Sequence, residues 1–201
     1  MKASGAFLCF VAALSPAIAA AAFDPNAMRQ KYVVGATYHT MGFTGAEVRD
    51  VDGNAGDELL IGYTNMWQIL RWDNKSADFA QVGFYENSYG NVFGGGGLVS
   101  VHFAAFDRSA PTQVAVLGEN GSIGRFELDG SLRTPFWSPP LQNVIRMLIA
   151  DVDNQPGDEV LLQNSSELTA WKYGASTPLW RIPVQPNESV LLAQLDSDPQ
   201  L

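Results

Sequence analysis

The sequence predicts an all-β protein, a β-propeller built of four-stranded blades. An acidic loop at residues 50–59 recurs at residues 151–160 with the same residue plan, and each copy separates two apolar runs. With weaker copies around Asp107 and Asp196, the repeat recurs at steps of 55, 46 and 43 residues, close to the period of about 40 to 50 residues of four-stranded propeller blades. No segment after the N-terminal leader keeps a helical apolar period over three turns, so solenoids of helices are excluded.

Residues 1–19 are predicted to be a signal peptide. Lys2 gives a positive start, residues 5–14 form a short apolar core, and Ala17-Ile18-Ala19 offers the small-residue pattern that a signal peptidase accepts. An uncleaved membrane anchor is the alternative, but the apolar stretch is short for a transmembrane span. We therefore expect a secreted, periplasmic or cell-surface protein with no membrane span in the mature chain. The single cysteine, Cys9, lies in the leader, so the mature chain would keep none for a disulfide.

The remaining chain divides into segments that follow the repeat. In the N-terminal segment, residues 20–45, Lys31–Thr37 has the pattern of a strand that closes the last blade of a propeller. The segments predicted after it are a first blade at 46–98, a second, degenerate blade at 99–142, a third blade at 143–189 and the truncated start of a fourth at 190–201. Because a closed propeller needs at least about four blades, we expect an incomplete propeller that belongs to a longer protein.

Within each blade, apolar alternation predicts short strands joined by polar turns. In the third blade, Val144–Ala150 is predicted to be the innermost strand and Leu179–Pro183 the outer one, because proline cannot donate to a ladder and suits an edge. Aromatic side chains near the last two strands of each blade are expected to fill the space between neighbouring sheets. They are Trp72, Phe84, Phe126, Trp137, Trp171 and Trp180.

The chain is acidic, with a net charge of −9 and a pI of about 4.5. Nucleic-acid binding needs clustered Lys and Arg to neutralise phosphates, so that class of partner is excluded. An acidic surface is typical of a solvated extracellular protein and also suits one that collects cations.

The acidic loops offer the kind of ligand that calcium prefers. Calcium takes about six to eight hard oxygens from carboxylates, amides and carbonyls, and alternating Asp residues in a tight turn point their carboxylates to one side. His39 and His102 are scattered and the mature chain has no Cys, which argues against zinc and copper. The alternative is a turn without any ion, because Asp side chains also accept hydrogen bonds from backbone N–H groups.

The plan Asp-x-Asp-Gly-x-x-Gly-Asp-Glu-Leu between two apolar strands resembles the FG-GAP or VCBS repeat. That repeat builds the seven-bladed propellers of integrin α-chains and of many bacterial secreted proteins. The resemblance covers residues 46–201, and it is strong in the first and third copies and weak in the second. In that family the loop joins the first two strands of a blade and often holds calcium.

The resemblance implies ligands at loop positions one, three, five and nine, with a backbone carbonyl at position seven. In the first loop these are Asp50, Asp52, Asn54, the carbonyl of Gly56, and Glu58. In the second loop they are Asp151, Asp153, Gln155, the carbonyl of Gly157, and Glu159.

The loops depart from the family pattern at two positions. Position five holds Asn54 or Gln155 in place of Asp, and position six holds Ala55 or Pro156 in place of Gly. Each lost carboxylate weakens calcium affinity, so the first loop is expected to bind calcium better than the second. The corresponding loop of the second repeat, Asp107–Thr112, has lost nearly every ligand and is expected to be metal-free.

The sequence offers no catalytic constellation. His39 and His102 have no partner that spacing alone identifies, and the serines lack the nucleophile-elbow pattern. We therefore expect a secreted or surface-exposed, non-catalytic binding module with calcium-stabilised loops, whose partner is an extracellular protein or carbohydrate. The alternative is the propeller portion of a secreted carbohydrate-active enzyme whose catalytic part lies outside this chain.

Overall fold

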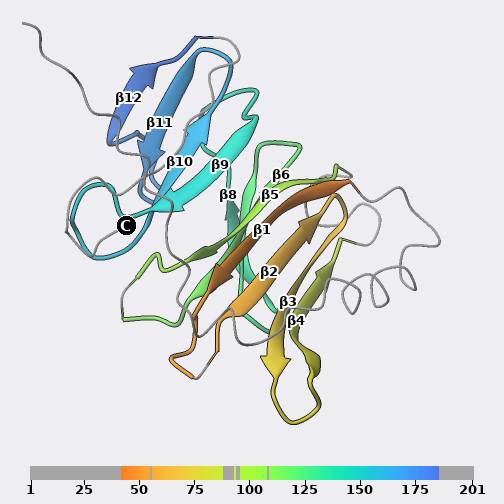
Figure 1. The fold of residues 1–201 in the computed structure, drawn as a ribbon. Coiled ribbons are helices and arrows are strands. Elements are labelled where there is room, and N and C mark those ends of the chain that lie inside the picture. Colours follow the sequence, from red (N-terminus) through yellow and green to blue (C-terminus); the bar gives the residue numbers. More distant parts are fainter. Residues whose placement is uncertain (1–41, 55, 88–92, 94–95, 108, 186–201) are drawn as a thin grey trace, which may run out of the picture. The chain divides into compact units, whose positions relative to one another are not determined.

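The computed structural model describes residues 42–185 apart from residues 55, 88–92, 94, 95 and 108. Within that part the chain forms three four-stranded antiparallel sheets and no helix (Figure 1). The described residues therefore include no helix that is long and apolar enough to cross a membrane. The predicted signal peptide, the strand predicted at Lys31–Thr37 and the fourth-blade segment at 190–201 lie outside the described residues.

The first sheet follows the chain in simple up-and-down order, β1-β2-β3-β4. Its strands are β1 (Phe43–Arg49), β2 (Glu58–Tyr63), β3 (Met66–Asp73) and β4 (Asp78–Glu86). The acidic loop joins β1 to β2, as predicted from the two apolar runs that flank it. Asp73 ends β3 because its carboxylate accepts hydrogen bonds from the N–H of Lys75 and the hydroxyl of Ser76, which close the turn into β4.

The second sheet repeats this order over strands β5 to β8. They are β5 (Leu98–Ala104), β6 (Gln113–Gly118), β7 (Ile123–Phe126) and β8 (Leu132–Trp137). Every residue of β6 is buried, which fits a strand whose apolar run lacks alternation. Asn120 and Asp129 accept N–H hydrogen bonds from Ser122 and Ser131 and so close the β6–β7 and β7–β8 turns.

The third sheet has the same antiparallel order over strands β9 to β12. They are β9 (Arg146–Ala150), β10 (Glu159–Gln163), β11 (Glu167–Trp171) and β12 (Trp180–Pro183). Pro183 ends the outermost strand, as the sequence predicted from its missing donor. Because the second acidic loop joins β9 to β10, it occupies the same place in its sheet as the first loop does between β1 and β2.

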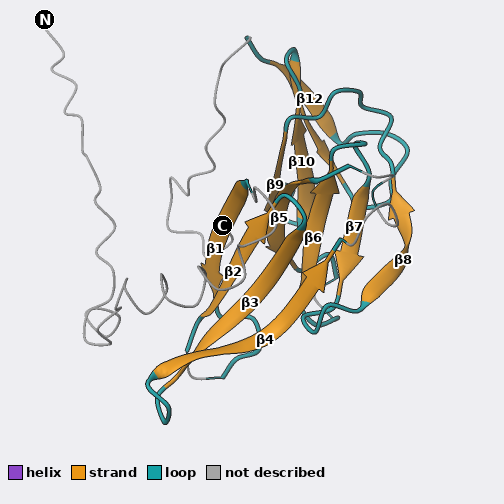
Figure 2. Ribbon diagram, turned by 90° about the vertical axis from the view of Figure 1, so that its right-hand side faces the viewer, coloured by secondary structure: helices purple, strands orange, loops and turns teal. Residues whose placement is uncertain are grey.

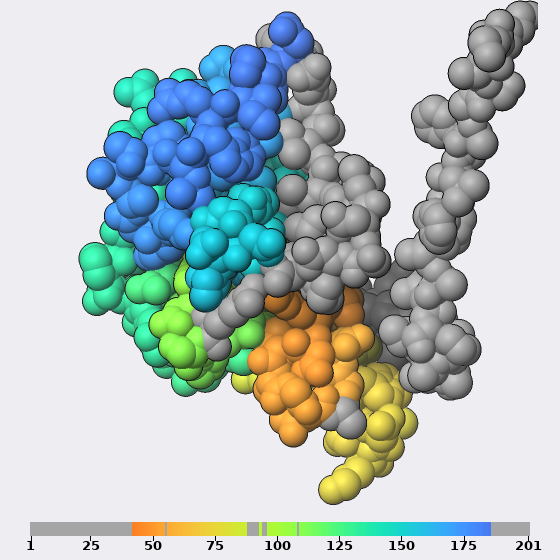
Figure 3. Space-filling view, turned by 90° about the vertical axis from the view of Figure 1, so that its left-hand side faces the viewer, coloured from red at the N-terminus to blue at the C-terminus, as the bar shows by residue number. Residues whose placement is uncertain are grey.

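The sheets pack on one another in chain order (Figure 2). Two apolar clusters lie between them. Leu60, Trp67 and Ile69 of the first sheet pack against the second sheet around Phe103, Val116 and Phe126. On the other side of the second sheet, Leu117 and Trp137 pack against Met147, Val160 and Trp171 of the third. The surface view follows the same order, from the orange and yellow of the first sheet through green to the blue of the third (Figure 3).

The prediction for the aromatic side chains holds for three of the six. Phe126, Trp137 and Trp171 are buried in the inter-sheet clusters. Trp72 and Phe84 do not belong to these clusters, and Phe84 is 37% exposed, so the prediction was wrong for them. The reason is strand alternation, because Trp67 and Ile69 point toward the second sheet and Trp72, an odd number of residues further on, points to the opposite face.

Trp180 is also outside the two inter-sheet clusters. It packs against Leu161, Leu168 and Ala170 on the outer face of the third sheet. No other described sheet covers that face, so the expectation that Trp180 lies between two sheets stays a prediction.

Candidate functional site

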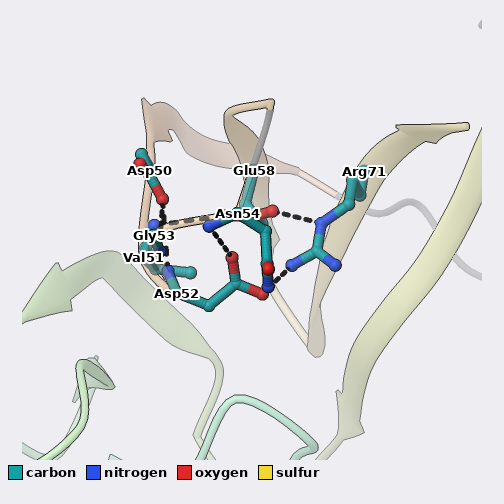
Figure 4. Close-up of polar contacts among 7 residues, drawn as sticks. All are labelled: Asp50, Val51, Asp52, Gly53, Asn54, Glu58 and Arg71. Atoms are coloured by element: carbon teal, nitrogen blue, oxygen red, sulfur yellow. Dashed lines mark hydrogen bonds and ion pairs between the residues drawn. The ribbon is translucent and has the colours of Figure 1, made fainter.

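The first acidic loop gathers three carboxylates at the junction of β1 and β2 (Figure 4). Oxygen atoms of Asp50, Asp52 and Glu58 lie within 4.8 Å of one another, a spacing at which they could hold a metal ion. Asp50 directly follows β1 and Glu58 begins β2, so the two strands fix both ends of the cluster.

Backbone hydrogen bonds give this loop its shape. One carboxylate oxygen of Asp50 accepts the N–H groups of Asp52 at 3.3 Å and Gly53 at 2.8 Å, and Asp52 accepts the N–H of Asn54 at 3.0 Å. Gly53 has a φ of 71°, in the left-handed region that glycine adopts without steric cost. The two aspartates therefore hold a tight turn as well as offering ligand oxygens.

Glu58 is fully buried, and both of its carboxylate oxygens have partners. Oε2 accepts the N–H of Val51 at 3.1 Å, and Oε1 accepts Nε of Arg71. Arg71 lies opposite Glu58 in the β2–β3 register, and its Nη2 also contacts Asp52 (Figure 4). A guanidinium therefore bridges two of the three carboxylates.

The second loop has the same construction. Asp151, Asp153 and Glu159 bring carboxylate oxygens within 4.8 Å of one another. Asp151 accepts the N–H of Asn154, and Asp153 accepts the N–H of Gln155, both at 2.9 Å. Asn154 has a φ of 63° at the position of Gly53, and asparagine is one of the few side chains that tolerates this conformation.

A basic side chain also reaches this second cluster. Glu159 is fully buried and its Oε2 accepts the N–H of Val152 at 2.7 Å. Nζ of Lys172 contacts Oε1 of Glu159 and lies 3.1 Å from Asp153. Lys172 directly follows β11, whose last residue, Trp171, pairs with Val160.

These contacts favour the charged form of one aspartate in each loop, Asp52 in the first and Asp153 in the second. The side chain and the N–H of Asn54, followed by Arg71, lower the pKa of Asp52. Burial opposes the shift at Asp153, but hydrogen bonds from Gln155 and Lys172 lower the pKa of that carboxyl as well.

The two basic side chains are shifted in the complementary direction. The hydrogen bond to Glu58 is the main cause that raises the pKa of the Arg71 guanidinium. At Lys172 burial acts against the shift, but contact with Glu159 and then Asp153 raises the pKa of the ammonium. In each loop, therefore, one aspartate, Asp52 or Asp153, is favoured in its charged form and has a basic side chain against it.

Three of the five ligands that the resemblance implies in each loop lie together in the structure. The structure brings together the carboxylates at loop positions one, three and nine in both loops. At position five, the backbone N–H groups of Asn54 and Gln155 donate to Asp52 and Asp153, and the Asn54 side chain also bonds to Asp52. The donors are hard oxygens and fit a divalent cation in type. Arg71 and Lys172 disfavour a metal ion at these carboxylates, because the ion would lie close to their positive charge.

The second loop also links the second and third sheets. Asp158 accepts the N–H of Ala105 at 2.6 Å and donates its own N–H to the carbonyl of Ala105 at 2.9 Å. Gly157 packs so closely that a Cβ there would lie 2.3 Å from the carbonyl oxygen of Phe106. The Gly-Asp-Glu sequence thus combines close backbone approach, an inter-sheet hydrogen bond and a buried carboxylate.

The corresponding loop of the second repeat is built as a simple turn. Asp107 accepts the N–H of Ser109 at 2.8 Å and its hydroxyl at 2.7 Å. This is the side-chain turn that Asp forms without an ion.

Sequence reasoning missed the partners of His102. The Ser100 hydroxyl lies 2.8 Å from Nε2 of His102, and Nδ1 lies 3.3 Å from Oε2 of Glu47. Ser100 also donates to the carbonyl of Met147 at 3.4 Å. This chain of contacts joins β1, β5 and β9, the first strands of the three sheets. Ser100 and His102 are two residues apart on one strand and so share a face, but Glu47 is too distant in sequence for spacing to reveal it.

The sequence matches no family model, and a comparison with curated proteins finds no significant match. Among solved structures, a chain in the crystal structure of BBS1N in complex with ARL6DN, soaked with lead, is similar with a TM-score of 0.43 and 14% identity. The match covers 73% of this chain and 42% of that chain, so this chain spans less than half of the other's length. A similarity at this level carries no argument about family or function.

Proposed function

We propose that the chain is a secreted or surface-exposed β-propeller module of the FG-GAP or VCBS type, which acts by binding and not by catalysis. The observation that carries this proposal is the duplicated loop, with three carboxylates at the same place in the first and third sheets. Three consecutive sheets packed in chain order support propeller blades, since each sheet buries a face on the next.

Calcium is the proposed ion of the acidic loops. The clusters contain carboxylates and no sulfur or imidazole ligand, which favours a hard cation. Calcium also accepts flexible coordination by carboxylates and carbonyls, whereas magnesium requires nearly octahedral geometry. When bound, the ion would neutralise the carboxylates and fix the connection between the first two strands of its blade.

Calcium is expected to raise the melting temperature of the protein, because an ion that binds only the folded loop stabilises it by mass action. At about 100 times the dissociation constant the gain is about 2.7 kcal/mol. Differential scanning calorimetry with calcium and with EGTA measures this gain. Asp52→Ala should reduce it by removing a ligand of the first loop.

Asp129→Ala is the matched control for that measurement, because Asp129 closes a β-turn by accepting the N–H of Ser131 and belongs to neither acidic cluster. It should lower the melting temperature yet leave the calcium-induced rise unchanged. An Asp52→Ala protein with the wild-type calcium response would remove the first loop from the proposal.

The proposed partner is an extracellular protein or carbohydrate. The net charge of −9 supports a partner other than nucleic acid. The alternative proposal is the propeller portion of a secreted carbohydrate-active enzyme whose catalytic part lies outside this chain. Sequencing the complete reading frame decides between them, because further repeats favour a binding module and an appended domain with a carboxylate pair favours an enzyme.

The contacts of His102 raise a second candidate function, hydrolysis. Ser100, His102 and Glu47 follow the order of a nucleophile, a base and an orienting carboxylate. We favour a structural role, because Ser100 is only 8% exposed and its hydroxyl also faces the carbonyl of Met147. A substrate carbonyl would have to reach this oxygen between packed strands.

A fluorophosphonate probe, which labels activated serines, should therefore leave the protein unlabelled. Mass spectrometry of the intact protein detects the adduct. Labelling that disappears in Ser100→Ala and in His102→Ala, with both variants folded by circular dichroism, would instead establish a reactive serine. Ser109→Ala serves as the control, since Ser109 hydrogen-bonds to Asp107 and does not belong to the Ser100–His102–Glu47 chain of contacts.

A further inference from the structure

In the described part of the chain, each acidic cluster is in contact with a basic side chain, and the two basic residues occupy the same place in their repeats. Arg71 lies 13 residues after the buried Glu58 and 19 after Asp52. Lys172 lies 13 residues after the buried Glu159 and 19 after Asp153. A basic residue therefore recurs at the same position in both repeats, as the carboxylates do.

The buried glutamate explains why a cation is needed. Glu58 and Glu159 are fully buried, and a buried carboxylate without a positive partner is strongly destabilising. Val51 and Val152 each supply one N–H hydrogen bond, which satisfies one oxygen but adds no net positive charge. The other oxygen of each glutamate contacts Arg71 or Lys172, which supplies that charge.

A metal ion and the basic side chain would use the same carboxylates. Oε1 of Glu58 and Oδ2 of Asp52 are the atoms that Arg71 contacts, and both residues belong to the cluster that could hold a metal. A divalent ion among these oxygens would lie within a few ångströms of the guanidinium, where like charges repel. Repulsion therefore disfavours the presence of both cations in the cluster at once.

We propose that Arg71 and Lys172 are internal cations that close the acidic loops without a metal and compete with calcium for the same carboxylates. The competition rests on the proposed calcium binding. The closed loop without metal rests only on the contacts described above. Calcium then binds by displacing a side chain, and the native loops bind it more weakly than their carboxylates alone would allow.

The test removes the cation and measures calcium affinity. Isothermal titration of calcium chloride into wild type and Arg71→Met compares the first loop with and without its internal cation. The variant is expected to bind calcium about tenfold more tightly, which corresponds to about 1.4 kcal/mol. Lys172→Met should tighten the second loop in the same way. Arg133→Met is the matched control, because Arg133 pairs with Glu127 outside both clusters, and it should leave the affinity unchanged.

The melting temperature in EGTA separates the two parts of the proposal. Wild type should unfold cooperatively without calcium. Arg71→Met should unfold cooperatively only when calcium is present. If Arg71→Met does not fold even in calcium, Arg71→Gln takes its place, because its amide can still donate to Glu58 without a charge.

Equal calcium affinity in wild type and the neutral variant would overturn the competition and leave the calcium proposal standing. Calcium binding by the neutral variant alone would support the internal cation and remove calcium from the function of the native loops. Absence of calcium binding in every protein would overturn both the competition and the proposed calcium binding.

Discussion

Trp67→Ala is expected to lower the free energy of unfolding by about 3–5 kcal/mol, the usual cost of removing a large buried aromatic side chain. Trp67 is fully buried in the cluster between the first and second sheets. Its ring lies 5.6 Å from Phe126 of the second sheet and 6.3 Å from Tyr85 of its own sheet, measured between ring centroids. Alanine would leave a cavity at the contact between the two sheets. Urea unfolding followed by circular dichroism measures the loss.

Trp72→Ala is the matched control, because Trp72 lies on the same strand but outside the inter-sheet cluster. It contacts Phe79 across the β3–β4 hairpin at a centroid distance of 5.2 Å. We expect a clearly smaller loss than for Trp67. Equal losses for the two tryptophans would contradict the placement of the first sheet against the second.

Gly130→Ala is expected to cost about 1–3 kcal/mol more than Gly121→Ala, because added atoms in a packed contact force the backbone to move. Both glycines occupy turns of the second sheet and have positive φ, 96° at Gly130 and 78° at Gly121, so the backbone strain is similar. They differ in their surroundings. A Cβ at Gly130 would lie 1.9 Å from the carbonyl oxygen of Phe84, whereas one at Gly121 meets nothing within 4 Å among the atoms of the described chain.

The same measurement tests the contact between β4 of the first sheet and the β7–β8 turn of the second. A Cβ at Gly83 of β4 would lie 1.6 Å from the carbonyl oxygen of Leu128, so the first sheet and the β7–β8 turn approach backbone to backbone from both sides. Thermal unfolding of the two variants gives the comparison. If Gly130→Ala and Gly121→Ala unfold at the same temperature, the β7–β8 turn does not pack against β4.

Most of the strands could be predicted because local patterns determine them. The apolar runs on either side of each acidic loop became β1 and β2 or β9 and β10, and the polar turns became hairpins. The predicted boundaries differ from the observed ones by a few residues. The first sheet begins at Phe43 and not at residue 46, and the second begins at Leu98, which the prediction placed in the first blade.

The acidic carboxylates could also be predicted, since a short loop brings its own residues together. The shape of the turn followed as well, with glycine or asparagine at the left-handed position, Gly53 or Asn154. The basic partners could not be predicted from the loops alone, because Arg71 and Lys172 reach the clusters only through the pairing of the second and third strands. An alignment of the two repeats that extends 13 residues beyond the buried glutamates would have shown a basic residue at the same position in both.

Contacts between sheets were beyond the reach of sequence patterns. Glu47 and His102 meet only because the first strands of two sheets lie beside each other, and Asp158 reaches Ala105 in the same way. These pairs are separated by 55 and 53 residues. Periodicity identifies which side of a strand is buried, but it does not identify the residue on the next sheet that it meets.

The central claim is that each acidic loop holds one cation at a time, either calcium or its own basic side chain. X-ray diffraction from crystals in saturating calcium, with an anomalous difference map, tests this claim most directly. We predict a calcium peak among Asp50, Asp52 and Glu58, with the Arg71 guanidinium no longer in contact with Glu58. A guanidinium still bound to Glu58, with no peak at either loop, would contradict the claim and leave the loops as turns closed by their own side chains.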